Sequence, residues 1–176
     1  ISTSRDIITR LVVEINAEMQ KLEHKIQSPE VSPHKTETKK FNIQKFDFEN
    51  AGKASTEIKK QLKQMNTDRK ILRRIAVAMY ELEMNQVVHS EGGTLECTIG
   101  PDKVIIYAKD RGPGIEDTEK ALEEGFSTAN EWIRSLGFGA GMGLPNARRV
   151  SDSFSLESAK GQGTTVIAEI NLKEKE

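Results

Sequence analysis

The chain has 176 residues, of which 36% are hydrophobic and 30% are charged, and its formal net charge is −1. This balance excludes a protein that coats nucleic acid through charge, so we expect no direct nucleic-acid partner. A domain near this size buries roughly 70% of its unfolded surface and needs no disulfide or structural metal. The lone Cys97 could not form an internal disulfide in any case. Because no run approaches ~20 apolar residues and no secretory signal pattern is present, we expect a cytoplasmic protein with no membrane partner.

The first forty residues combine a heptad pattern with a linker. Residues 28–40 contain two prolines and almost nothing apolar, which is typical of a linker. Before them, apolar residues recur at the spacing of a heptad seam at Ile8, Leu11, Ile15, Met19, Leu22 and Ile26. This predicts a helix that packs on the domain or on its own copy. We therefore expect an extension over 1–40, a domain over 41–176, and a homodimer through either part as an open possibility.

The remaining patterns alternate between helical and extended stretches. Imperfect alternation over 41–48 predicts a strand with one slip, and Pro145 is expected at the first position of a short helix. The other predicted elements, in chain order, are a helix after 51–56, a long helix over about 68–89, a hairpin of strands 94–99 and 103–110, and closing strands 153–158 and 163–172. The predicted helices and hairpin strands occupy separate stretches of the sequence and do not alternate strictly. The sequence therefore predicts an α/β (α+β) two-layer sandwich with a mixed, mostly antiparallel sheet.

Two common phosphate-binding loops can be tested against the glycine-rich segments. The segment AGKAS at 51–55 resembles the end of a Walker loop, but the required glycine five residues before Gly52 is Asp47. Within GFGAGMGL no register satisfies G-x-G-x-x-G. The sequence therefore argues against a P-loop and against a dinucleotide-binding Rossmann site.

A polar face interrupts the long predicted helix. Glu81, Asn85 and His89 are spaced four residues apart and share one face, while Glu83 points away from them. A carboxylate beside an amide oxygen suits Mg²⁺, which keeps several waters, and the carboxylate could orient or deprotonate one of these waters. The alternative is a polar helix face with ordinary hydrogen bonds.

Two glycine-rich segments follow. In DRGPGI, Asp110 ends a predicted strand and the glycines would let a flat ligand approach the backbone, although a plain turn would look the same. In GFGAGMG at 137–143, four glycines at alternate positions precede a predicted helix. Their exposed N–H groups and the helix N-terminus could bind an anion, whereas the alternative is a flexible linker.

Taken in order, these segments resemble the GHKL superfamily of ATPases and kinases, which has the Bergerat ATP-binding fold. The resemblance covers about 41–172 and rests on ELEMN, DRGPG, GAGMG and GQGTT, which begin at 81, 110, 139 and 161. It implies ATP and Mg²⁺ as cofactors, and Glu81 as the base or as the residue that orients the attacking group. It also implies that Asn85 ligates Mg²⁺, that Asp110 binds the adenine amino group, and that Thr164 approaches the base directly or through water. Further binding residues implied by the resemblance are Gly112 and Gly114 beside the adenine, and Gly139, Gly141, Gly143 and Leu144 at the phosphates.

Within the superfamily the chain is most similar to anti-sigma-factor serine kinases and switch kinases. The features are E-x-x-x-N-x-x-x-H ending at His89, a connection of eight residues between Thr128 and Gly137, and the run GMGLPNARRVSDSFSLES. This implies phosphorylation of a serine on a STAS-type anti-anti-sigma protein, with a sigma factor as a second candidate partner. Arg111 and the pair Arg148 and Arg149 are candidates to reach a phosphate, and we expect one of the pair to be solvated.

Two alternatives stay open. One is an ATP-gated partner-binding module with little phosphotransfer. The other is the catalytic fragment of a histidine kinase, for which His24 is the only candidate acceptor and does not resemble the usual His-Glu-Leu-Arg context.

Overall fold

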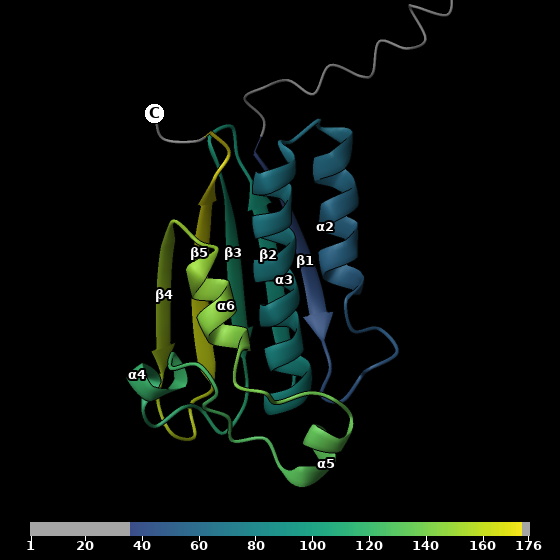
Figure 1. The fold of residues 1–176 in the computed structure, drawn as a ribbon. Helices are drawn as coiled ribbons and strands as arrows, with labels where there is room; N and C mark the ends of the chain where they lie inside the picture. Colours follow the sequence, from purple (N-terminus) through teal and green to yellow (C-terminus); the bar gives the residue numbers. More distant parts are fainter. Residues whose placement is uncertain (1–35, 174–176) are drawn as a thin grey trace, which may run out of the picture. The chain divides into compact units, whose positions relative to one another are not determined.

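A computed structural model of the chain describes residues 36–173, and the predicted heptad helix lies outside the described residues. Five antiparallel strands form one sheet in the order β1-β2-β3-β5-β4, and the main helices cover one face of it (Figure 1). The strands are β1 (Glu37–Ile43), β2 (Gly93–Ile99), β3 (Lys103–Asp110), β4 (Ser153–Ser158) and β5 (Thr164–Asn171). The helices are α2 (Lys53–Gln64), α3 (Arg69–His89), α4 (Thr118–Ala121), α5 (Glu131–Ser135) and α6 (Gly143–Arg149). The predicted two-layer, mostly antiparallel sandwich is thereby confirmed.

The long helix α3 is the centre of the helical layer. Asp68 caps it by accepting hydrogen bonds from the backbone N–H groups of Lys70 and Ile71, at 2.8 and 3.3 Å. Its apolar side chains pack on α2, α6 and the sheet and include Ile71, Ile75, Ala78, Met79 and Leu82, all of them buried. Within residues 36–173, no helix is both long enough and apolar enough to span a bilayer.

The β2–β3 hairpin fixes which end of the sheet carries polar residues. Its turn closes with a 2.9 Å hydrogen bond from the Gly100 N–H to the Lys103 carbonyl. In this register Cys97 lies opposite Ile106, and both are buried against the helices. Asp110 lies opposite Gly93, at the end of the hairpin away from the turn. Asp110 therefore lies at the end of the sheet where β5 begins.

Two sequence predictions need correction. The predicted strand over 41–48 ends at Ile43, because Phe46 has a left-handed φ of 57° and its N–H donates to the Val87 carbonyl at 2.8 Å. The strand instead starts at Glu37, inside the segment assigned to the linker. Pro145 is the third residue of α6, not the first. Proline is tolerated there because the first N–H groups of a helix have no partner within it.

Phe46 and Phe48 therefore lie in a loop and pack on the segment that follows β3. The ring centroids of Phe46 and Trp132 are 5.1 Å apart, and those of Phe48 and Phe138 are 5.2 Å apart. The apolar alternation over 41–48 had predicted strand positions for Phe46 and Phe48. These two rings instead pack the loop before α2 against α5 and the residues after it.

Glu83, on the face of α3 away from Glu81, caps α2 from the side. Only 2% of Glu83 is exposed, and its carboxylate accepts from the backbone N–H groups of Gly52, Ala54 and Ser55 at 3.0–3.2 Å. These are donors that the first turn of a helix cannot satisfy itself, and a carboxylate is favoured at that end of the helix dipole. Glu83 therefore has a structural role.

We predict that Glu83→Gln lowers the free energy of unfolding by about 1–3 kcal/mol, because a buried donor loses its charged acceptor. The matched control is Glu57→Gln, whose side chain is 53% exposed and pairs with Lys39; such a surface pair contributes about 0–1 kcal/mol. Urea unfolding of both variants measures the difference. Equal stability of the two variants would contradict the assigned role.

Candidate functional site

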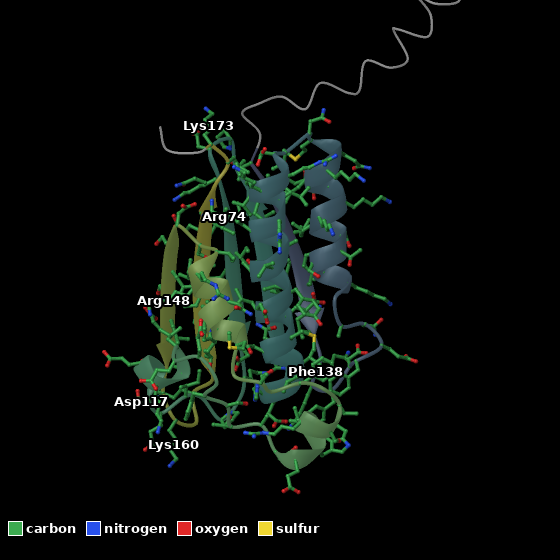
Figure 2. The ribbon with its side chains drawn as sticks, viewed as in Figure 1. Arg74, Asp117, Phe138, Arg148, Lys160 and Lys173 are labelled. Atoms are coloured by element: carbon green, nitrogen blue, oxygen red, sulfur yellow. The ribbon has the colours of Figure 1, made fainter. Side chains whose placement is uncertain are left out.

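A cavity of about 910 Å³ lies at the end of the sandwich where α3 and β3 end and β5 begins. Asp117, Phe138 and Lys160, labelled in Figure 2, are among the residues that line it. Most residues predicted from sequence also line this one cavity, namely Glu81, Asn85, His89, Asp110, Gly114, Gly139, Gly141, Gly143, Leu144 and Thr164. Gly112 is not among the lining residues, although a Cβ there would lie 3.1 Å from Asp110 Oδ1.

Glu81 and Asn85 form the helical wall of the cavity. Glu81 Oε1 accepts a hydrogen bond of 2.8 Å from Asn146 Nδ2, whereas Asn85 Nδ2 is buried without a partner among the described residues. A Cβ on Gly143 would lie 3.0 Å from Asn85 Oδ1 and 3.5 Å from Glu81 Oε2. A glycine at this position therefore keeps space open beside both oxygens. Burial lowers the pKa of His89, one helical turn further on, so this imidazole is neutral at pH 7.

Asp110 and Thr164 form the wall on the sheet side. Asp110 Oδ1 accepts from the Thr164 N–H at 3.1 Å, and no described residue donates to Oδ2. The Thr164 hydroxyl lies 3.0 Å from the Ser158 hydroxyl. Burial raises the pKa of Asp110, while the bond from Thr164 acts in the opposite direction. The result is a half-buried carboxylate with one unpaired oxygen at the cavity.

The close approach of β5 to Asp110 requires glycine at Gly163. This residue has φ 76°, and a Cβ on it would lie 2.3 Å from the Asp110 carbonyl oxygen. Such contacts exclude any side chain. GQGTT was identified only by resemblance, and the structure gives a physical reason for its second glycine.

The glycines of 137–143 bring two stretches of the loop after β3 together. At Gly141, with φ 73°, a Cβ would lie 2.4 Å from the Gly125 carbonyl carbon, and the Gly125 N–H donates to the Gly141 carbonyl at 2.9 Å. At Gly139 a Cβ would lie 2.2 Å from the Ala129 Cβ. Both glycines also line the cavity, so the alternating pattern serves packing as well as access to the backbone.

The arginines named as phosphate candidates lie away from the cavity lining. Arg149 donates to Asn146 Oδ1 and, at 3.2 Å, to Glu124 Oε1. Arg148 is exposed on α6 (Figure 2) and has no hydrogen-bond or ion-pair partner among the described residues. Arg111 is exposed and is not a lining residue either. We predicted that one arginine of the pair Arg148 and Arg149 is solvated, and Arg148 is that residue.

The polar residues of the site that were missed from sequence include Lys120, Lys160 and Asn146. Lys120 and Lys160 line the cavity and add positive charge to it. Asn146, which bonds Glu81, lies one helical turn after Gly143. The start of α6 was the signal that could have identified Asn146, because residues three apart share a helix face.

The fold and this cavity define a two-layer α/β domain with a ligand site between a helix, a strand end and a glycine-rich segment. Residues 70–174 match the model of the family described as histidine kinase-, DNA gyrase B-, and HSP90-like ATPase. The chain belongs to this family, which confirms the resemblance seen in its sequence.

Curated relatives include kinases and anti-sigma factors. The chain is 37% identical over 99 residues to serine/threonine-protein kinase RsbT of Bacillus subtilis, covering 54% of this chain and 68% of that protein. It is 34% identical over 97 residues to the anti-sigma F factor of Thermoanaerobacter sp. strain X514, covering 52% of this chain and 64% of the relative. It is 30% identical over 125 residues to the anti-sigma F factor of Clostridium perfringens strain SM101, covering 68% and 86%. The chain thus spans about two thirds of the length of the first two relatives.

The raised pKa of Asp110 predicts a dependence of stability on pH. The folded chain binds this proton more tightly than the unfolded chain, whose pKa is near the ordinary value of 3.8. Stability is therefore lost as the pH rises from about 4 through the folded-state pKa. We predict that Asp110→Asn, which carries no charge, unfolds at a higher urea concentration than the wild type near pH 7 and gains less near pH 3.

The control for this measurement is Asp102→Asn, in the β2–β3 turn, whose carboxylate is 75% exposed. It should show no such gain at either pH. A wild type that is more stable than Asp110→Asn near pH 7 would contradict the assigned effect of burial.

Proposed function

We propose that the chain binds ATP with Mg²⁺ in this cavity and transfers the γ-phosphoryl group to a serine of a STAS-type anti-anti-sigma protein. The observation that carries the proposal is that Glu81, Asn85, Asp110 and the glycines of 139–143, separated in sequence, line one cavity. Membership of the ATPase family and similarity to a protein named as a serine/threonine kinase support it. Similarity to anti-sigma F factors supports a partner in transcription control.

The donors and acceptors of the cavity fit ATP. Asp110 Oδ2, which no described residue donates to, can accept from the adenine amino group, and Thr164 lies beside it. At the other wall, the backbone N–H groups of 139–143 suit phosphate oxygens, and Lys120 adds positive charge to the cavity lining. A base and a phosphate chain are thereby accommodated at opposite sides of one space.

The residues also fit Mg²⁺ held jointly with phosphates. Among the described residues no group of three or more His, Cys, Asp or Glu side chains could hold a metal alone. Mg²⁺ commonly takes one or two protein oxygens together with substrate phosphates and waters. Asn85 Oδ1 provides such an oxygen beside the space that Gly143 leaves open. When bound, the ion would neutralise phosphate charge.

Glu81 would act on the attacking serine. Oε1 is engaged by Asn146, which leaves Oε2 to accept the hydroxyl proton. The bond between the serine oxygen and the γ-phosphorus forms as the bond to the ADP oxygen breaks. Phosphoryl transfer of this type depends mainly on positioning and on electrostatic stabilisation, which agrees with a site of backbone donors and few charged side chains.

A second candidate is an ATP-gated partner-binding module with little transfer, which the names of the anti-sigma F factors favour. The histidine-kinase alternative depends on His24, which lies outside the described residues. Acid-labile phosphate on His24 would distinguish that alternative.

The nucleotide site is tested by calorimetric titration with ATP, with and without Mg²⁺. We expect Asp110→Asn to weaken binding ~10- to 100-fold, the loss of a hydrogen bond to a charged group. Asn85→Ala should remove the Mg²⁺ dependence while leaving metal-free binding close to the wild type. Asp102→Asn is the control and should bind normally. Absence of ATP binding by the wild type would overturn the proposed site.

The transfer step is tested with labelled ATP, Mg²⁺ and a recombinant STAS-domain anti-anti-sigma protein, compared with its serine-to-alanine variant. Acid-stable label on the first protein alone is the expected result. Glu81→Gln should lower the rate by ~10²- to 10⁴-fold with ATP affinity retained, because a general base is lost. ATP binding without transfer, together with nucleotide-dependent partner binding, would favour the partner-binding module instead.

A further inference from the structure

A series of hydrogen bonds between side chains outside the cavity ends at Glu81. Asn146, on α6, donates from Nδ2 to Glu81 Oε1 at 2.8 Å. Asn146 itself is not one of the residues that line the cavity. It is therefore placed to act on the carboxylate without contacting a ligand.

The neighbours of Asn146 determine which way its amide points. A guanidinium can only donate hydrogen bonds and an ionised carboxylate can only accept them. Arg149 donates to Asn146 Oδ1, so the NH₂ group must face Glu81. An amide is the side chain that can serve both neighbours at once, since a carboxylate in its place would repel Glu81.

This series of hydrogen bonds continues from Asn146 to the loop after β3. Arg149 also donates to Glu124 Oε1 at 3.2 Å. Glu124 precedes Gly125, whose N–H donates to the carbonyl of Gly141 at 2.9 Å. Glu81 is thus connected through α6 to the stretch of loop that holds the glycine segment.

The hydrogen bond from Asn146 also gives the two carboxylate oxygens of Glu81 different surroundings. Oε1 is engaged by Asn146, while Oε2 lies 3.5 Å from the position that a Cβ on Gly143 would take. The free oxygen is therefore on the side of the glycine segment, beside Asn85 Oδ1. A base held in this way needs no rotation of its carboxyl group to meet an attacking hydroxyl.

We propose that Asn146 is a positioning residue for Glu81, with its amide oriented by Arg149 and Glu124. The inference rests on the proposed role of Glu81 as the base. Because misplacement of a reacting group by about 1 Å can cost ~10²-fold in rate, a residue outside the cavity can govern the transfer step.

The test is a steady-state comparison with the recombinant STAS-domain protein as acceptor, together with calorimetric ATP affinity for each variant. Asn146→Asp keeps the size and the acceptor for Arg149 but loses the donor to Glu81. It should lower kcat ~10- to 100-fold, with the ATP affinity and the KM for the acceptor within about twofold of the wild type. Asn146→Gln, which keeps the amide, should recover part of the rate.

Two further variants separate positioning from general damage to α6. Arg149→Gln leaves the bond between Asn146 and Glu81 possible but releases its anchor, so a smaller decrease confined to kcat is expected. Arg148→Gln, at the adjacent exposed position, is the matched control and should behave as the wild type. Thermal unfolding of all variants checks that each is folded.

The outcomes separate this inference from the proposed function. If the wild type transfers phosphate and Glu81→Gln is impaired while Asn146→Asp is not, the positioning role is overturned and the kinase function stands. An equal loss of ATP affinity and kcat in Asn146→Asp would also overturn it, because the residue would then act on binding. If the wild type binds ATP but transfers nothing, the kinase function fails and the positioning role fails with it.

Discussion

A hydrogen bond from the Thr164 N–H to the Asp110 carboxylate holds that carboxylate where the pairing of β3 with β5 ends, and the sheet-side wall of the cavity depends on it. The bond requires the backbone of Gly163 to pass within a distance of Asp110 that no side chain would permit. The Ser158 hydroxyl supports the same corner by donating to the Gly163 carbonyl at 2.7 Å. Strand pairing thereby fixes a carboxylate at one wall of the cavity.

The opposite wall is fixed by packing. The α3 helix lies against the sheet through buried apolar residues and carries Glu81 and Asn85 on the turns near its end. Its placement is reinforced through α2, whose N-terminal donors are satisfied by the buried Glu83. Two carboxylates two positions apart on one helix thus have different roles, because their side chains face different surroundings. Glu83 stabilises the fold, whereas Glu81 faces the cavity.

The site places polar groups where apolar groups would favour stability. Asn85 Nδ2 is buried without a partner among the described residues, and Asp110 is a charge partly removed from water. Such groups lower the stability of a fold unless a ligand satisfies them. This combination at one cavity supports the proposal that a ligand binds there.

Much of this arrangement could be predicted from sequence. The period of apolar residues identified α3, because it reflects burial on one side, and two strand-like runs on either side of the turn at 100–102 identified the β2–β3 hairpin. Nearly all the site residues that the ordered motifs indicated line the cavity, with Gly112 as the exception. The end of β1 could not be predicted, since Phe46 continues the apolar alternation although its backbone is left-handed.

The start of α6 could have indicated Asn146, but the contacts that Asn146 and Gly163 make could not be predicted from sequence. The hydrogen bond of Asn146 to Glu81 joins residues 65 positions apart. The close contact of Gly163 with Asp110 likewise joins β5 to β3, so it depends on strand pairing and not on local pattern. Both contacts depend on tertiary structure, which local sequence propensities do not predict.

The measurement that tests the central claim most directly is a crystal structure of the chain with Mg²⁺ and a non-hydrolysable ATP analogue. We predict that the adenine amino group lies within hydrogen-bonding distance of the Asp110 carboxylate, with the phosphates against residues 139–143 and the ion beside Asn85. A nucleotide bound elsewhere, or one in this cavity whose adenine does not contact Asp110, would contradict the account.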